Sequence, residues 1–222
     1  MKPIPITNFA DLYDFVAQGE DDRLIFRGVT NAAKHKLVPS IGRKPRRKGE
    51  TLKAFEQRIF RLFKERALPY LTHQPTSDWE WLAIAQHHGL PTRLLDWSYN
   101  PLAACYFAVE KAFDGDSALY AFSTSRIVRT DVDSPFSINA IAKFRPPHIT
   151  QRIIAQSGVF TVHPTPEEEF HGSGQVKIGL IANKVRKLLK RDLYKFGVNE
   201  STLFPGLDGI ARDLEWRHTD VH

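Results

Sequence analysis

The stretch LPTRLLDWSYNPLAACYFA, residues 90–108, joins two helix signals through a short polar segment. The first helix ends at Gly89, and Pro91 forces an extended exit. The second begins where Asn100 can act as the cap and Pro101 takes the first helical position. We therefore expect the polar side chains between them on a short connection, a place where such groups often line a cleft.

Hydrophobic periodicity predicts the other elements of the chain. Helical spacing indicates helices over residues 7–19, 51–71, 77–88, 100–113, 183–196 and 206–216. Short apolar, β-rich runs indicate strands over residues 23–30, 118–125, 158–164 and 175–182. The two kinds of element do not alternate regularly, which favours an α+β fold with a small mixed or antiparallel sheet surrounded by several helices. We expect a single domain over residues 1–222, with its core at 20–212 and a basic loop at 42–50.

Composition limits the class of protein. Hydrophobic residues make up 42% of 222, which is enough for a sizeable core, and the formal net charge is +6. A basic balance favours anionic partners, although a merely solvated basic surface has the same composition. The single cysteine, Cys105, lies in an apolar run and is expected to be a buried, inert thiol. The absence of an internal disulfide, a signal peptide and a long apolar segment indicates a cytoplasmic protein.

Arg27 stands inside the otherwise apolar run IFRGV, and Gly28 follows it. Burying a guanidinium without a partner is very unfavourable, so an anionic group is expected to face it. One interpretation is an internal ion pair, for which Asp96 is the obvious candidate. The other is a fork for a phosphate or carboxylate of a ligand, with Gly28 letting that ligand approach the backbone.

The polar segment after residue 86 offers further candidates. His87 and His88 suit acid, base or hydrogen-bonding roles, but histidines in a last helical turn also satisfy free carbonyl groups. Arg93 and Asp96 suit a pocket, and Asp96 equally suits a pair with Arg27 or Arg93. Adjacent histidines point in different directions on a helix, and the usual metal-ligand spacings are missing, so we expect no metal site.

Later stretches add an amide, a run of carboxylates and a set of cations. Gln156 fits a contact to a ligand amide or ribose hydroxyl, or simply a turn, and Glu167 to Glu169 fit a solvated acidic turn. Basic residues gather in the loop 42–50 and on the helix 183–196, and they indicate nucleic-acid contact or a solvated face. The expected nucleic-acid contacts are Arg43, Lys44, Arg46, Arg47, Lys187 and Lys190.

Four blocks together resemble the FRG-domain family, which takes its name from a Phe-Arg-Gly motif, here Phe26, Arg27 and Gly28. The blocks are IFRGV, IAQHHGLPTRLLDWSYNPLAACYFA, RIIAQSGVF and LFPGLDGIARDL, and they span roughly residues 20 to 212. The resemblance implies a protein from bacterial or phage-related contexts and a cytoplasmic location. It implies no particular reaction.

A second pattern is similar to ADP-ribosyltransferases of the arginine–serine–glutamate type, and it implies an ADP-ribosyltransferase-like fold. Its order here is Arg27-Gly28, then Ser123 to Ser125, then Glu167 to Glu169. In that family the arginine grips the pyrophosphate of NAD, the serine segment holds the nicotinamide ribose, and a glutamate stabilises the reacting carbon. The block 86–107 has no counterpart in that pattern. If Gln156 stands in for the glutamate, its amide cannot act as a base, and the site acts by positioning and electrostatics or only binds.

Three functions therefore compete. The first is an NAD-consuming transferase, as a toxin or anti-phage effector acting on nucleic acid or protein. The second is a nucleic-acid-binding or nucleic-acid-cleaving module, and the third is a non-catalytic interaction domain.

The transferase is our working hypothesis, with NAD as substrate, no metal and no membrane partner. It implies an anionic ligand, a nucleic-acid or protein acceptor, and an antitoxin or chaperone partner. It places Gln156, Glu168 and His88 at the reacting centre. The residues expected around the ligand are Arg27, Gly28, Thr92, Arg93, Asp96, Asn100, Ser123 and Ser125.

Overall fold

The computed structural model describes residues 2–17, 24–71, 74–146, 150–172 and 175–219. Its centre is a seven-stranded sheet with the strand order β1-β7-β4-β2-β3-β6-β5. Only the pair β1–β7 is parallel among the pairings of the described strands, so the sheet is mixed. The strands are β1 (Ile4–Ile6), β2 (Leu24–Val29), β3 (Leu94–Ser98), β4 (Ser117–Ser123), β5 (Ala142–Phe144), β6 (Gly158–Val162) and β7 (Val176–Ile181).

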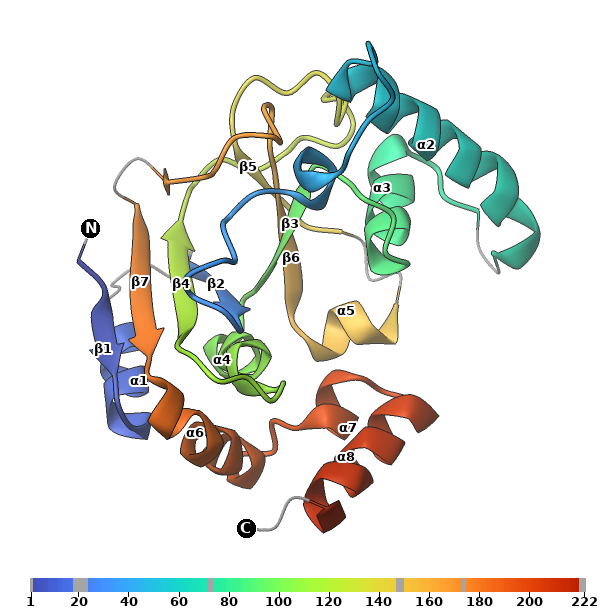
Figure 1. Ribbon diagram of the computed structural model, residues 1–222. Coiled ribbons are helices and arrows are strands. Elements are labelled where there is room, and N and C mark those ends of the chain that lie inside the picture. Colours follow the sequence, from blue (N-terminus) through green and yellow to red (C-terminus); the bar gives the residue numbers. More distant parts are fainter. Residues whose placement is uncertain (1, 18–23, 72–73, 147–149, 173–174, 220–222) are drawn as a thin grey trace.

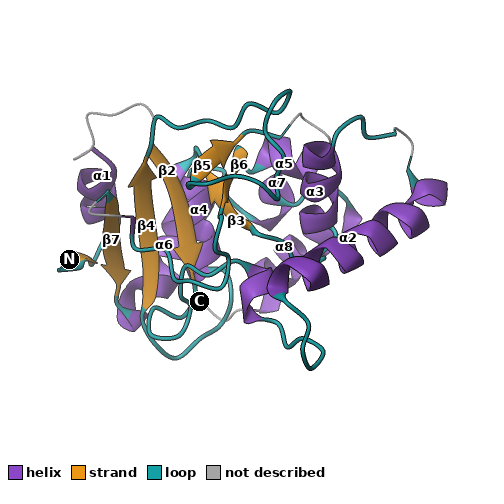
Figure 2. Ribbon diagram, turned by 90° about the horizontal axis from the view of Figure 1, so that it is seen from above, coloured by secondary structure: helices purple, strands orange, loops and turns teal. Residues whose placement is uncertain are grey.

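Helices pack around this sheet, and the α+β class expected from the sequence is confirmed (Figure 1). The described α-helices are α1 (Phe9–Ala17), α2 (Leu52–Ala67), α3 (Asp78–His87), α4 (Pro101–Val109), α5 (Gln151–Ala155), α6 (Asn183–Lys195), α7 (Glu200–Leu203) and α8 (Leu207–Thr219). Two short 3₁₀ helices, η1 (Ser40–Arg43) and η2 (Leu68–Tyr70), flank α2. Viewed from above, α2 is a long helix at one side of the molecule, away from β1 and β7 (Figure 2). None of the helices within the described ranges combines the length and apolar character needed to span a membrane.

The expectation that residues 91–99 form only a connection is wrong. Residues 94–98 are β3, which lies between β2 and β6 in the sheet. Leu94, Leu95 and Trp97 are all buried, so this central strand shows no clean alternation of apolar and polar residues. Asp96 is its one exposed residue. Without alternation, and between two strong helix signals, the run looks like a loop in the sequence.

Other differences concern short elements. The strands β1 and β5 and the helices α5 and α7 have no counterpart in the sequence-based expectation, because each is only three to five residues long. The long helices were easier to predict, since their caps are present. Ser77 accepts a hydrogen bond from the backbone of Glu80, although the Glu80 carboxylate accepts from Thr76 rather than closing a capping box. The expected stop of the first helix at Gly19 lies outside the described residues.

Gly28 allows α4 to pack directly on β2. A Cβ atom at this position would lie 1.9 Å from the backbone oxygen of Ala104 and 2.7 Å from the backbone nitrogen of Ala108. The helix therefore lies against the strand at the closest distance that two backbones permit. Phe26, on the same strand, is buried in the core between the sheet and α4. The space that the missing side chain of Gly28 provides is filled by α4, although the residue also lines the cavity described below.

The sheet opens between β2 and β3. These two strands pair at Phe26 and Ser98, and no further residue pair joins them, although both strands are fully described. By contrast, β2 pairs with β4 along its whole length, from Leu24 to Val29. Beyond the single pair, Nη1 of Arg27 donates a hydrogen bond to the backbone oxygen of Asp96 at 2.6 Å. A side chain thus bridges the two strands where backbone pairing has stopped.

Candidate functional site

A cavity of about 730 Å³ lies at the opening between β2 and β3. Its size falls within the ~300–1,000 Å³ typical of small-molecule and cofactor sites. Its walls come from β2, β3, the segment 30–43, the end of α3, one face of α4 and the end of α5. Arg27, Gly28, Asp96 and Gln156, four residues expected at the site, line it together.

Arg27 is held at the cavity wall but is not sealed off from solvent. Its side chain is 21% exposed, and the carboxylate of Asp96 lies 3.6 Å from Nη1 with 59% of that side chain exposed. Nε is buried and has no hydrogen-bond partner among the described residues. Burial lowers the pKa of Arg27, and Asp96 opposes this only in part. Asp96 is therefore the partner of Arg27, as the first interpretation expects, and the pair faces an open cavity.

Asp96 is oriented by a chain of side-chain hydrogen bonds. Its Oδ2 accepts from Nε2 of Gln86 at 3.0 Å, and Oε1 of Gln86 accepts from the hydroxyl of Thr92 at 2.5 Å. Because Thr92 donates to the amide oxygen, the amide nitrogen of Gln86 must face the carboxylate. Thr92 is itself buried and does not line the cavity. We expected Thr92 to bind the ligand, but it acts on Asp96 through Gln86.

Cations outnumber carboxylates around the cavity. Its charged lining residues are the cations Arg27, Lys34, Lys36, Arg43 and Arg152 and the carboxylates Asp96 and Glu110. His35 and His87 also line it, and burial is the main cause that lowers the pKa of both. Near neutral pH both histidines are therefore neutral, and the excess positive charge belongs to lysine and arginine. Such a lining favours an anionic ligand.

Glu110 is the second carboxylate of the cavity. It follows α4 directly, and its side chain is only 16% exposed. Burial raises its pKa above the usual value, and the neighbouring Glu200 raises it further. Lys111 is its ion-pair partner, but at the long distance of 3.8 Å. A buried carboxylate with a raised pKa is a suitable proton acceptor.

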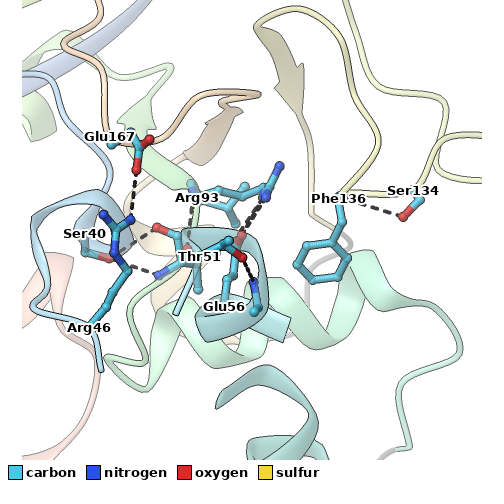
Figure 3. Close-up of polar contacts among 11 residues, drawn as sticks. Ser40, Arg46, Thr51, Glu56, Arg93, Ser134, Phe136 and Glu167 are labelled. Carbon is cyan, nitrogen blue, oxygen red and sulfur yellow. Dashed lines mark hydrogen bonds and ion pairs between the residues drawn. The ribbon is translucent and has the colours of Figure 1, made fainter. Parts of the chain in front are cut away.

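Arg93 does not reach the cavity, contrary to our expectation. Its guanidinium pairs with both carboxylate oxygens of Glu56 on α2 and lies over the ring of Phe136 (Figure 3). The two charged side chains are 5% and 1% exposed. This pair therefore anchors α2 to the sheet.

Two further residues from the stretch 86–107 lie elsewhere. His88 lines a separate apolar groove between α2 and α3, whereas its neighbour His87 lines the main cavity. The side chain of Asn100 accepts hydrogen bonds from Leu102 and Ala103 and so caps α4. Gln156 does line the cavity, but its Nε2 donates to the backbone oxygen of Leu203 at 3.0 Å.

The arginine–serine–glutamate pattern is not assembled at this cavity. Ser123 pairs with Leu24 at the end of β2 that is remote from the cavity, and Ser125 lies in the exposed segment that follows. Glu168 lies in an exposed turn, where its carboxylate accepts from Thr165. None of these serine and glutamate side chains lines the cavity.

The expected nucleic-acid contacts fall into two groups. Arg43 lines the main cavity, whereas Lys44, Arg46 and Arg47 are exposed, with Arg46 paired to Glu167 (Figure 3). Lys187 and Lys190 lie on α6, on the other side of α4. The cations are thus spread over two surfaces. No group of three or more potential metal ligands occurs among the described residues.

Several lining residues were not anticipated. Gln86, Phe107, Glu110 and Arg152 come from three different helices, and only the fold brings them beside Arg27. One signal was available for Gln86 and Phe107, since both belong to the polar-to-apolar block 86–107. Arg152 begins the block RIIAQSGVF, whereas nothing comparable marks Glu110 in the sequence.

The comparison with protein families bears on this arrangement. The family model of the FRG domain matches residues 22–117. This segment of the chain is similar to the FRG domain. The matched range contains β2, the α3–β3–α4 unit and Glu110, and it therefore supplies most of the cavity wall. Comparisons with curated proteins and with solved structures gave no match.

The FRG motif itself can now be explained residue by residue. Phe26 fills the core beneath α4, Arg27 enters the cavity, and Gly28 leaves room for the backbone of α4. The blocks RIIAQSGVF and LFPGLDGIARDL, which also suggested the family, lie beyond the matched FRG range. The former nevertheless contributes Arg152 and Gln156 to the same cavity.

Proposed function

We propose that the cavity binds a phosphate-bearing nucleotide, and that the protein is an NAD-dependent ADP-ribosyltransferase-like effector. The observation that carries this proposal is the Arg27–Asp96 pair, open to a cavity of about 730 Å³ with an excess of cations. Guanidinium groups bind phosphate through paired, charge-assisted hydrogen bonds. A site that only binds phosphate does not need a carboxylate beside the guanidinium, so the presence of Asp96 suggests a further role.

The lining divides between the two ends of a dinucleotide. The pyrophosphate fits the side of Arg27, Lys34, Lys36 and Arg43, where the cations gather. The aromatic ring of Phe107 offers a surface for a base or the nicotinamide. Asp96 and Glu110 supply the negative charge that a positively charged sugar carbon requires.

The reaction that this lining supports is cleavage at the anomeric carbon of the nicotinamide ribose. The bond between that carbon and the nicotinamide nitrogen breaks, and its electron pair leaves with nicotinamide, which becomes neutral. Asp96 stabilises the oxocarbenium-like transition state, as carboxylates do in glycoside hydrolysis. A lone pair of the acceptor then forms the new bond to the carbon, and the acceptor's proton passes to Glu110.

These roles replace those that the sequence suggested. Glu168 and His88 lie outside the cavity, and the amide of Gln156 cannot take up a proton near neutral pH. Asp96 is held in place by Gln86, and Glu110 is a buried carboxylate with a raised pKa. Asp96 and Glu110 therefore fit the reacting centre better than Glu168, His88 and Gln156 do.

Titration with NAD, followed by measurement of nicotinamide release, tests the proposal. Arg27→Lys keeps the charge but loses the fork, and we expect NAD binding to weaken about 10- to 100-fold. Asp96→Asn should lower nicotinamide release by about 100-fold or more with binding nearly unchanged, because it removes charge stabilisation in the transition state. Arg61→Lys, an exposed change on α2, is the matched control and should alter neither quantity.

The outcomes separate the competing functions. If NAD binds without any nicotinamide release, the protein is a nucleotide-binding module rather than a transferase. If neither NAD nor another phosphate-bearing nucleotide binds to the folded protein, the proposal fails and an interaction domain is the remaining reading.

A further inference from the structure

Two more cavities continue from the one beside Arg27. The second, of about 560 Å³, lies among α4, α6, α7 and α8 and shares Phe107, Glu110 and Arg152 with the first. The third, of about 340 Å³, lies beside α6 and shares Glu110 with both. We call them the Asp213 cavity and the Lys187 cavity, after one lining residue of each. Glu110 thus lines all three cavities.

The Asp213 cavity contains a buried acceptor that lacks a donor. Asp213 is 5% exposed, and its Oδ2 pairs with Arg217 at 3.2 Å. The other oxygen, Oδ1, is buried without a hydrogen-bond partner among the described residues. An unsatisfied buried carboxylate oxygen is unfavourable, and a donor supplied by a ligand would satisfy it.

The rest of the lining suits a flat group that carries hydrogen-bond donors. Five aromatic side chains contribute to the wall, together with two further carboxylates. Glu200 is already engaged by Tyr106 and Arg212, which leaves Asp213 and Glu110 to face a ligand. Carboxylates accept hydrogen bonds from exocyclic amino groups of bases, and aromatic rings stack on their faces.

The Lys187 cavity adds a basic lining beside the Asp213 cavity. Its charged lining consists of the cations Lys111, Arg186, Lys187, Lys190 and Arg191 and the carboxylate Glu110. Lys190 lies over the ring of Trp216 with its Nζ 4.6 Å from the ring centre. Lys187 and Arg191 are exposed on successive turns of α6. A row of cations beside an aromatic cavity is the arrangement by which single-stranded nucleic acids are bound.

Charge decides between a nucleic-acid and a protein acceptor. An arginine or lysine side chain entering the Asp213 cavity would meet Lys111, Arg152, Lys190 and Arg212, and these four cations outnumber the three carboxylates. A nucleic-acid strand has the opposite balance, because its phosphates are attracted and its base is neutral.

We propose that the Asp213 and Lys187 cavities bind single-stranded nucleic acid, with an amino-bearing base in the Asp213 cavity and phosphates along α6. Resting on the proposed transferase function, this strand is the acceptor. The amino nitrogen of the base forms the bond to the anomeric carbon as nicotinamide departs with its electron pair. The nitrogen's proton passes to Glu110, at the junction of the cavities.

Binding is measured first, without NAD, by fluorescence anisotropy of labelled DNA strands. Strands of about 12 nucleotides suit the ~4–16 nucleotides that such surfaces cover. We expect oligo-dA or oligo-dC to bind more tightly than oligo-dT, because thymine lacks an amino group. The double variant Lys187→Glu/Arg191→Glu should weaken binding at least about tenfold and flatten its salt dependence. The control Lys53→Glu/Arg61→Glu makes the same charge change on α2 and should have a much smaller effect.

A second variant tests the base pocket. Asp213→Asn should abolish the preference for amino-bearing strands while leaving the salt dependence intact. If that variant does not fold, Trp216→Ala should weaken binding of every strand. Equal binding of all strands, or equal effects of the α6 and α2 variants, would overturn the inference.

Transfer is then measured by mass spectrometry of the strand after incubation with NAD. A mass increase of one ADP-ribose on oligo-dA or oligo-dC is expected, whereas modification of an arginine-rich peptide instead would favour a protein acceptor and overturn the inference. Nicotinamide release without strand binding would leave the transferase standing and remove this acceptor. Strand binding without nicotinamide release would leave the nucleic-acid site standing and remove the transferase function.

Discussion

Three neighbouring residues of β2 make three different kinds of contact. Phe26 is buried beneath α4, Arg27 borders the cavity, and Gly28 touches the backbone of α4. Under the proposed function, only Arg27 of the three contacts the ligand. The other two fix the position of α4, and with it the position of Phe107 and Glu110 on the cavity wall.

Gly28→Ala is expected to destabilise the fold. The added methyl group would meet the backbone oxygen of Ala104, and no side-chain rotation can relieve a clash with backbone. We expect a loss of about 1–3 kcal/mol or more in the free energy of unfolding, measured by urea denaturation. Ser125→Ala, an exposed change, is the control. A Gly28→Ala protein as stable as the parent would show that α4 does not lie as close to β2 as described.

The sequence allowed the chemistry of single residues to be predicted better than their partners. An arginine in an apolar strand had to face an anion, and Asp96 is that anion. Arg93 was expected beside the same pocket, because it belongs to the polar segment between two helix signals. Its partner Glu56 is 37 residues away on a different helix, and helical periodicity alone does not reveal which way α2 packs. The pair therefore became visible only in the fold.

At the scale of elements, the junction between α3 and β3 positions the carboxylate of Asp96. Gln86 lies in the last turn of α3, Asp96 lies in the middle of β3, and the segment between them carries Thr92. Thr92 also accepts a hydrogen bond from the backbone of Leu94, where the strand begins. One buried hydroxyl thus fixes both the start of the strand and the amide that holds Asp96.

Thr92→Val tests this positioning role. Valine keeps the shape but removes the hydroxyl, so the amide of Gln86 is no longer fixed toward Asp96. We expect nicotinamide release to fall by about tenfold, with little change in NAD binding. Thr92→Ser restores the hydroxyl and should recover most of the rate. Loss of rate in both variants, in proportion to stability, would indicate a structural role only.

The strand β3 also shows where element prediction failed. All its residues except Asp96 are buried, on both faces, so the alternation that marks a half-buried strand is missing. The helices on either side were predicted because caps and stop residues mark their ends. The site was expected on a loop and is instead held by a central strand, which gives Asp96 a more rigid support.

For the whole molecule, the sheet depends on both halves of the chain. The matched FRG segment contains β2 and β3, but β3 pairs with β6, and β4 pairs with β7, both of which lie beyond residue 117. The α+β class could be predicted from the order of elements. The strand order could not, because long-range pairing leaves no local mark in the sequence.

The stability of the whole fold should fall in mild acid because of His163. This side chain is 2% exposed, and its ring shares a hydrogen bond with Thr161, which also accepts from Trp97. Burial, with smaller effects of Arg27 and Arg93, lowers its pKa to about 3. Between that value and 6.5 the unfolded chain binds a proton that the folded protein does not, so stability decreases as the pH falls.

We expect a loss of about 1.4 kcal/mol per pH unit below pH 6.5 from this group. Urea denaturation of the parent and of His163→Gln, between pH 7 and 4.5, measures the difference in slope. The variant should show a flatter dependence even if it is less stable at pH 7. Identical slopes would mean that His163 is charged in the folded protein or accessible to water.

Because β2 and β3 pair at a single residue pair, ligand binding in the cavity between them should affect how firmly the two strands are held together. Nη1 of Arg27 spans the gap by donating to Asp96, and a phosphate that recruits the same guanidinium competes for that tether. Occupancy of the cavity by a ligand is then thermodynamically linked to the association of the strands β1, β7, β4 and β2 with the strands β3, β6 and β5. Amide hydrogen exchange along β3 would register a bound nucleotide even in a variant that has lost all turnover.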